Sequence, residues 1–378
     1  MKKTFTIIAA LVAGALQAET VLTFSPSGAS NQKTDCLPTD ISSPNAPFTW
    51  ETWFCVASGK LNLAENRILA QTGWLWKDSG RLVLETRNTS SQTGGKTKLA
   101  VFYNDGSNQR VIGTTTITAG WHHAAMVRNG KSLTIYLDGN YDGKTENGYI
   151  NSPTGNATSQ PFVIAPAFYG SLSEVRVWNV ARTAEEIAAY KDVRLVGNEA
   201  NLIGYWPLNE GTETVTPTNV VTGVAAVSKT ASGQTAGYNV GAGTASYEEN
   251  NDLVFDVLVA AAGGKTVRVS GSWLKENTTR AATDDAANAR LKVWQCYVLG
   301  LDPEIAADDF RITSFPMNAN GAPNLAGIEV SPSTNGWNVS GATYKVKGKA
   351  MLADGWQDVD PASVNPALRF FAVELVLP

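Results

Sequence analysis

Ser132-Leu-Thr-Ile-Tyr-Leu137 alternates apolar and polar side chains and is followed directly by Asp138-Gly139. Successive side chains of a strand point to opposite faces, so the apolar residues would lie on one face, with Thr134 and Tyr136 on the other. The Asp-Gly step is a signal for a tight hairpin turn. The stretch therefore predicts a half-buried strand that ends in a turn.

Similar short patterns recur through the first 225 residues. The clearest are Phe48–Val56, Arg81–Glu85, Lys98–Tyr103 and Glu174–Trp178. One helix interrupts them, because Thr183-Ala-Glu-Glu186 has the spacing of a capping box. Many short strands separated by turn signals predict an all-β fold, an antiparallel jelly-roll sandwich.

The composition divides the chain into parts. Residues 19–228 hold the strand patterns of the first domain, and residues 229–251 are rich in Ala, Gly, Ser and Thr, which predicts a linker. Residues 252–378 combine further strand patterns with helical spacing over Asp285–Leu299, which ends at Gly300. We expect a second, smaller α+β domain there, mostly β.

The N-terminus carries an export signal. Residues 1–18 contain Lys2 and Lys3, then an apolar stretch too short to span a bilayer, then small residues. The sequence therefore predicts a secreted or cell-surface protein without a transmembrane segment. Export permits disulfides, so Cys36 and Cys55 form either a bridge between neighbouring strands or two small buried side chains.

The charge balance narrows the set of partners. The chain has 30 basic and 34 acidic residues, a net charge of −4. No basic excess is available to neutralise phosphates, so we expect no nucleic acid partner. Two His and three Cys also argue against a zinc site with several ligands.

Four stretches of the first domain resemble the laminin-G-like, concanavalin A-like lectin and glucanase family. They are Phe48–Phe54, Trp121–Gly139, Gly170–Ile187 and Leu202–Gly211. The resemblance implies two stacked antiparallel sheets, an extracellular location and binding of glycans or proteins, sometimes with calcium. The chain departs from the family at Ser25–Asn31, where an acidic turn would be expected after the first strand. That departure removes support for a metal at this turn.

The second domain is similar to a C-terminal module found on exported proteins of verrucomicrobia-like bacteria. Ala289–Pro303 and Arg369–Leu375 carry this similarity. The first stretch also resembles the helical ending of acidic calcium-binding linkers, but the acidic repeats that would precede it are absent. The resemblance implies surface display or sorting, possible contact with the cell envelope, and no calcium.

Hydrolases of the same family use Glu-x-Asp-x-x-Glu, because two carboxylates must flank the sugar bond. No Glu-x-Asp occurs in the chain. The strands that resemble the family offer only Glu51 and Glu174, which lie far apart in sequence. We therefore predict that the protein is not an enzyme, with a hydrolase that pairs acids from distant segments as the alternative.

Aromatic faces stack on sugars, and carboxylates or amides bond their hydroxyl groups. The residues that fit this chemistry at turn-like positions are Trp74, Trp76, Tyr103, Asp105, Asp138 and Tyr141. The alternative is that both Trp residues are core and that the Asp-Gly steps are ordinary turns. Asp138 and Asp142 are the candidate calcium ligands, although the distal Glu of an EF-hand is missing. His122 and His123 are adjacent, so they would point to opposite faces and serve packing.

The sequence thus predicts a secreted or surface protein that binds a glycan or glycoprotein through its first domain. The first alternative is a structural or adhesive envelope protein with a protein partner. The second alternative is a polysaccharide hydrolase of the same fold.

Overall fold

The fold is described here from a computed structural model of the chain. The predicted signal peptide lies outside the described residues, as do Trp74, Trp76 and Asp105. The described ranges are 19–24, 33–36, 46–71, 82–104, 107–147, 162–210, 217–229, 245–250, 252–261, 265–306, 310–314, 329–332, 337–340, 342–349, 357–359 and 370–377.

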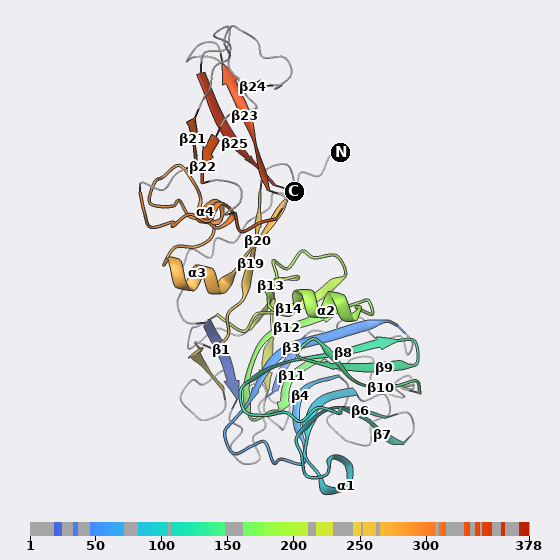
Figure 1. The fold of residues 1–378 in the computed structure, drawn as a ribbon. Helices are drawn as coiled ribbons and strands as arrows, with labels where there is room; N and C mark the ends of the chain where they lie inside the picture. The colour runs from blue at the N-terminus through green and yellow to red at the C-terminus, as the bar shows by residue number, and fades with distance from the viewer. Residues whose placement is uncertain are drawn as a thin grey trace. The chain divides into compact units, whose positions relative to one another are not determined.

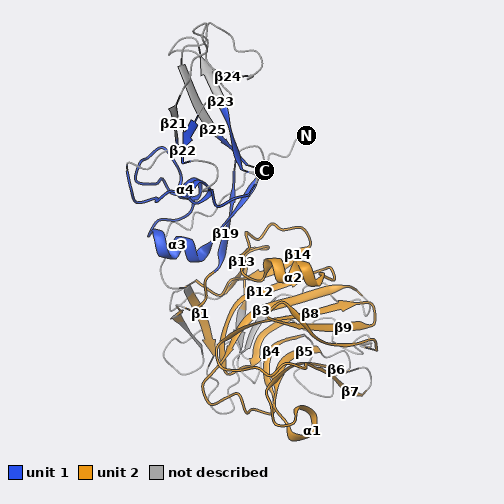
Figure 2. Cartoon of the chain, viewed as in Figure 1, with its two compact units in different colours: residues 1–17, 255–378 blue, residues 18–254 orange. Residues whose placement is uncertain are grey.

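The chain divides into two compact units, which Figure 2 colours separately. One unit comprises residues 18–254, and the other comprises residues 255–378 together with 1–17. Strands occupy both ends of residues 229–251, the range predicted as a linker. Lys229 ends strand β17 (Val227–Lys229), and strand β18 (Ala245–Asn250) pairs antiparallel with β1 (Glu19–Phe24). Pairing at a sheet edge requires backbone groups rather than apolar side chains, so composition did not indicate it.

The first unit is an antiparallel sandwich, coloured blue to yellow-green in Figure 1. The eight-stranded sheet has the order β10 (Asn140–Thr145), β9 (Ser132–Leu137), β8 (Trp121–Asn129), β3 (Phe48–Val56), β12 (Gly170–Trp178), β1 and β18, with β14 (Leu202–Trp206) also on β12. The seven-stranded sheet has the order β17, β2 (Lys33–Cys36), β11 (Phe162–Ala167), β4 (Asn66–Gln71), β5 (Leu82–Arg87), β6 (Lys98–Asn104) and β7 (Asn108–Ile112). The remaining elements of this unit are α1 (Ser90–Thr93), α2 (Ala184–Tyr190), β13 (Val193–Arg194), β15 (Thr218–Asn219) and β16 (Val224–Ala225). The predicted fold class, a mostly-β antiparallel sandwich, is confirmed.

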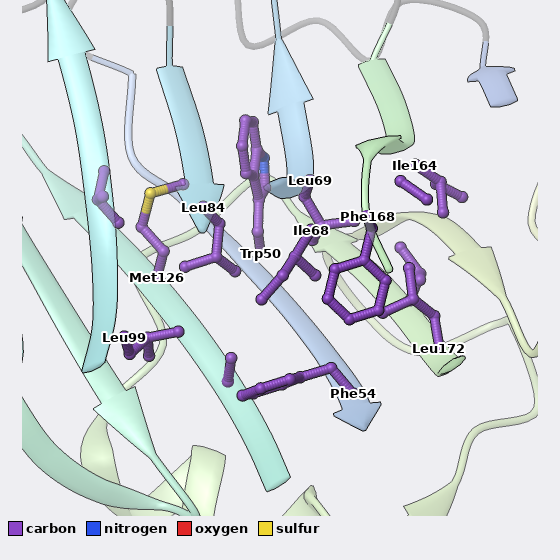
Figure 3. Close-up of a cluster of buried hydrophobic side chains, with 14 of the residues drawn as sticks. Trp50, Phe54, Ile68, Leu69, Leu84, Leu99, Met126, Ile164, Phe168 and Leu172 are labelled. Carbon is purple, nitrogen blue, oxygen red and sulfur yellow. The ribbon is translucent and has the colours of Figure 1, made fainter. Parts of the chain in front are cut away.

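The main core consists of the inward side chains of the two sheets (Figure 3). Strand β3 contributes Trp50 and Phe54, which are both fully buried. Leu84 of β5 and Ile164 of β11 are in the same cluster and come from the other sheet. The alternation therefore sends Glu51, Trp53 and the other odd-numbered residues of β3 to the outer face of the eight-stranded sheet.

A β-bulge in β12 sets which side chains reach that outer face. Ser173 pairs with Trp53 and Arg176 with Glu51, so β12 has one more residue than β3 between these pairs. Glu174, inside the bulge, has the positive φ of 56°. The extra residue allows both Leu172 and Val175 to enter the core.

Helix α2 lies against the outer face of the eight-stranded sheet (Figure 1). Ile187 of the helix is fully buried against Ala125 and Val127 of β8. The predicted capping box is present, because the Thr183 side chain accepts the N–H of Glu186 and the Glu186 side chain accepts the N–H of Thr183. Sequence alone thus placed the start of this helix correctly.

The second unit combines strands and short helices. Its elements are β19 (Asp256–Ala260), β20 (Thr266–Val269), α3 (Gly271–Asn277), α4 (Val293–Leu299), β21 (Arg311–Ser314), β22 (Glu329–Ser331), β23 (Thr343–Lys349), β24 (Gln357–Asp358) and β25 (Phe370–Val376). The helix predicted over 285–299 occupies only 293–299. The Asn288 Oδ1 atom accepts the N–H groups of Arg290 and Leu291, which closes a loop before the helix begins. Within the ranges given above, no helix has the length and apolar character needed to cross a membrane.

The predicted disulfide between Cys36 and Cys55 is not formed. Cys36 lies in β2 of the seven-stranded sheet, whereas Cys55 lies in β3 of the eight-stranded sheet. Cys55 is an odd-numbered position of β3, so its side chain points away from the other sheet, and it is a free thiol. Burial raises the pKa of this thiol.

Candidate functional site

The turn between β9 and β10 displays a fixed carboxylate. Asp138 has the positive φ of 53°, and its side chain remains 43% exposed. Its Oδ2 atom lies 2.9 Å from Nδ1 of His122, and its Oδ1 atom accepts the backbone N–H of His123 at 2.8 Å. Both contacts come from the start of β8, so the carboxylate has a defined direction although it faces solvent.

The same contacts set the charges at the turn. The hydrogen bond to Asp138 raises the pKa of His122. Partial burial acts to raise the pKa of Asp138, but the bonds from His122 and from the His123 N–H outweigh it and lower that pKa. The Asp138 carboxylate is therefore ionised at neutral pH.

Tyr141 follows this turn and is the most exposed aromatic side chain in the described ranges. Its exposed fraction is 61%. It lies opposite Tyr136 in the β9–β10 register, and the two rings meet edge to face with centroids 6.4 Å apart. A sugar ring could stack on Tyr141 while Asp138 and the exposed Asn140 bond its hydroxyl groups.

Helix α2 packs against the turn between β9 and β10. A Cβ atom at Gly139 would lie 3.3 Å from the Ala188 Cα atom and 3.3 Å from the Lys191 Cδ atom. Gly139 also has a φ of 81°, which favours glycine. The position of the turn therefore depends on the position of α2.

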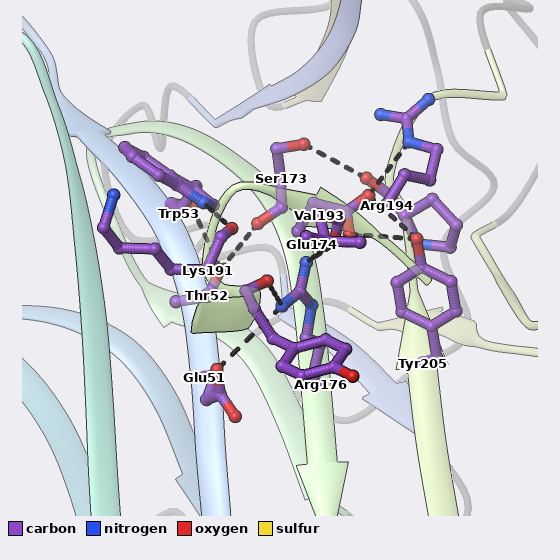
Figure 4. Close-up of polar contacts among 12 residues, drawn as sticks. Glu51, Thr52, Trp53, Ser173, Glu174, Arg176, Lys191, Val193, Arg194 and Tyr205 are labelled. Carbon is purple, nitrogen blue, oxygen red and sulfur yellow. Dashed lines mark hydrogen bonds and ion pairs between the residues drawn. The ribbon is translucent and has the colours of Figure 1, made fainter. Parts of the chain in front are cut away.

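A buried polar network holds the C-terminal end of α2 on the sheet (Figure 4). Trp53 Nε1 donates to the Lys191 carbonyl at 2.7 Å. Arg176, which is fully buried, donates to the carbonyls of Tyr190 at 2.9 Å and Val193 at 2.6 Å. The carbonyls of Tyr190 and Lys191 would otherwise be unpaired acceptors at the end of α2, whereas Val193 belongs to β13.

Two buried carboxylates balance the arginine charges of this network. Glu174 accepts from Arg176 at 2.8 Å and from the Tyr205 hydroxyl at 2.9 Å. Glu51 accepts from Arg182 at 2.7 Å and lies 3.4 Å from His123 Nε2. Glu51 and Glu174 are at most 1% exposed, so no substrate reaches them, and their role is to hold the helix.

The electrostatics of Glu51 follow from these contacts. Burial acts to raise its pKa, but the interaction with the nearby His123 and the charges of Arg182 and Arg176 outweigh burial and lower the pKa to about 2. Burial lowers the pKa of His123, so this histidine is neutral at pH 7. The packing role predicted for His123 agrees with its burial.

Two sequence-predicted site residues are placed differently. Tyr103 is 4% exposed and lies in the core between the sheets, so it is not available to a ligand. The Asp142 Oδ1 atom accepts the N–H groups of Thr114 and Thr115, which ties β10 to the loop after β7. Asp138 has other partners, as given above, and a calcium site at Asp138 and Asp142 stays a prediction. Across the described ranges, no group of three or more His, Cys, Asp or Glu could hold a metal ion.

Sequence reasoning missed a charged cluster on the outer face of the seven-stranded sheet. Glu65 and Glu85 both accept from Arg87 Nη1, at 3.0 and 3.5 Å, and both accept from Arg110. Their Oε1 atoms are therefore at most about 6.5 Å apart, the sum of these two distances. The alternation of β5 places Glu85 and Arg87 on one face, but only the folded sheet brings Glu65 and Arg110 to them.

A protein-family model matches part of the first unit. Residues 28–188 match the family model of the concanavalin A-like lectin/glucanases superfamily. The match includes β3 to β12 and most of α2, so a lectin/glucanase-type domain accounts for the sandwich that carries the turn. It does not extend to residues 255–378, and the C-terminal module remains a prediction. No curated protein sequence matches the chain.

Several solved structures are similar to part of the chain at low identity and low TM-score. A candidate carbohydrate-binding protein from Bacteroides ovatus is 19% identical, with a TM-score of 0.44, over 62% of this chain and 61% of that protein. A heptameric SAP-like pentraxin from Limulus polyphemus is 14% identical, with a TM-score of 0.38, over 62% of this chain and 97% of the pentraxin. The CBM40 domain of the Ruminococcus gnavus IT-sialidase is 11% identical, with a TM-score of 0.31, over 44% of this chain and 96% of that domain. These are similarities of fold, and no residue role is transferred from them.

Proposed function

We propose that the protein is an exported, non-catalytic carbohydrate-binding protein. Its first unit binds a glycan or glycoprotein at the turn between β9 and β10. The family match of residues 28–188 supports a carbohydrate ligand. The observation that carries the location is the 61% exposure of Tyr141, which follows the turn that holds the Asp138 carboxylate. Stacking on Tyr141 and hydrogen bonds from Asp138 and Asn140 provide the binding, and no covalent step is involved.

A hydrolase would need two carboxylates that face a sugar bond. Glu51 and Glu174 are buried and paired with arginines. Glu65 and Glu85 are closer together, but both bind Arg87 and Arg110, and the Glu85 side chain is only 2% exposed. These contacts support binding without catalysis. We therefore expect no cleaved product when the protein is incubated with the glycan that it binds.

The test is a glycan array probed with the full chain, first with calcium and then with a chelator. Tyr141→Ala should abolish the selective signal because it removes the stacking ring. Tyr141→Phe is the matched control, since it keeps the ring and loses only the hydroxyl, and it should retain most of the signal. Because the described ranges hold no group of three or more His, Cys, Asp or Glu that could bind a metal ion, we expect the chelator to have no effect.

A blank array from folded protein would contradict the carbohydrate function. It would favour the alternative of an adhesive envelope protein with a protein partner. Equal loss of signal in Tyr141→Ala and Tyr141→Phe would instead contradict the stacking mechanism, because the ring would then not be the element that binds.

The second unit, residues 255–378, is proposed to attach the protein to the cell envelope. The similarity of its sequence to modules on exported proteins supports this role. After fractionation of the producing cells, the full chain should appear with the envelope. Recovery of the chain in the medium alone would contradict the attachment.

A further inference from the structure

Three arginines surround one carboxylate on the outer face of the seven-stranded sheet. Arg67 donates to Glu65 Oε2 at 2.8 Å. Arg87 and Arg110 donate to Glu65 Oε1 at 3.0 and 3.1 Å. The arginines come from β4, β5 and β7, so the sheet brings three guanidinium groups to a single anion.

The anion in this cluster is accessible to solvent. The Glu65 side chain is 32% exposed and the Arg67 side chain is 29% exposed. An ion pair that water reaches contributes little, because both partners can be solvated when it opens. Another carboxylate could therefore take the place of Glu65 at small cost.

Two of the arginines are held in place without Glu65. Arg110 Nε lies 3.2 Å from Glu85 Oε1, and the Arg110 guanidinium lies 4.9 Å from the centre of the Phe102 ring. Arg87 Nη1 lies 3.5 Å from the same Glu85 oxygen. Glu85 is 2% exposed on its side chain, so it stays in place when solvent or a ligand reaches the cluster. The guanidinium groups are thus preorganised for a carboxylate.

The charge balance of the cluster also favours an anion. Three guanidinium groups face two carboxylates. Burial and the nearby Glu65 charge raise the pKa of Glu85, despite the arginines. Glu65 has a lowered pKa, because its bonds to Arg67 and Arg87 outweigh its burial. Glu65 is therefore the ionised partner that an incoming anion would have to replace.

We propose that Arg67, Arg87 and Arg110 form a receptor for the carboxylate of an acidic sugar, and that Glu65 occupies this receptor until the ligand displaces it. That the carboxylate belongs to a sugar rests on the proposed function. The site is distinct from Tyr141, which lies at the edge of the other sheet. Arginine is suited to this role because its planar fork bonds both oxygens of a carboxylate.

The test compares full-chain variants on an array that carries uronate- and sialate-bearing glycans, their methyl esters, neutral glycans and acidic peptides. Glu65→Gln removes the competing carboxylate and should raise affinity for acidic glycans by about tenfold. Arg67→Ala should lower it by about tenfold. Glu146→Gln is the matched control, since Glu146 is 70% exposed and pairs with Lys144 on the other sheet. Methyl esterification of the ligand should abolish the effect of Glu65→Gln.

Thermal melting verifies that each variant is folded. Unchanged or weaker binding of acidic glycans by folded Glu65→Gln would overturn the inference. Equal binding of the esters would also overturn it, and so would a gain confined to acidic peptides. Glycan binding that is lost in Tyr141→Ala, together with acidic-glycan binding that does not respond to Glu65→Gln, would overturn this inference and leave the proposed function intact. If the unaltered protein bound no glycan on the array, that result would instead contradict the proposed function.

Discussion

Replacement of Glu51 by Gln tests the idea that the buried network holds helix α2. The change keeps the size of the side chain but removes its charge. Arg182, 2.7 Å away, and Arg176, 4.0 Å away, would then be left in the interior without this counter-charge. Removal of one partner from a buried ion pair costs about 3–5 kcal/mol in the free energy of unfolding.

The pKa of Glu51 gives a second measure of the same quantity. The folded protein lowers this pKa from 4.5 to about 2. Such a shift corresponds to about 3 kcal/mol of stability at neutral pH. A depressed carboxyl pKa contributes stability that is fully present above pH 4.5 and is lost as the pH falls toward 2. We therefore expect Glu51→Gln to reduce the free energy of unfolding by about 3 kcal/mol at pH 7.

Urea denaturation at pH 7, and at several values between pH 5 and pH 3, measures this effect. The difference between the unaltered protein and Glu51→Gln should shrink as the pH falls below 4.5, because the Glu51 carboxyl takes up a proton in the unfolded chain while it stays ionised in the folded protein. Glu146→Gln, at a 70% exposed side chain, is the control and should change stability by less than about 0.5 kcal/mol. A loss below about 1 kcal/mol at pH 7, or a difference that does not vary with pH, would refute the role of Glu51.

Three further outcomes are expected. Gly113→Ala should lower stability by about 1–3 kcal/mol in thermal melting, since its Cβ would lie 1.8 Å from Asp142 Oδ2; combination with Asp142→Ala should cost less than the sum of the single changes. In proton NMR, His122 should titrate above pH 6.5 and His123 below it, and Asp138→Asn should lower the pKa of His122. The raised pKa of His122 contributes stability that is present below pH 6.5 and is lost as the pH rises through the pKa of the folded protein. Tyr141→Ala should change the melting temperature little, because the side chain is exposed, so a large drop would indicate a structural role.

Local sequence determined the strands, the capped helix and the fold class. The alternating residues Ser132–Leu137 form β9, and Phe48–Val56 forms β3 with Trp50 in the core. Thr183 and Glu186 started α2 as their spacing predicted. These features depend on side-chain periodicity and on hydrogen bonds within a few residues, which the sequence shows directly.

The site depended on contacts that no local pattern contains. A turn-like position suggested a ligand-facing Tyr103, but its side chain is in the core. Asp142 is bound by the loop that contains Thr114. Glu85 would be judged a solvent-facing residue from its sequence, yet the sheet buries it beside arginines from other strands.

The sequence by itself determined that the first unit is an antiparallel sandwich with an exposed Asp-Gly turn. Only the tertiary structure decided which carboxylates are buried supports and which face solvent. The β12 bulge, the packing of α2 under Gly139 and the meeting of Glu65 with three arginines all join residues from different strands. Burial and charge pairing across strands are properties of the assembled sheets. They distinguish a carboxylate that faces solvent from one that is a buried support.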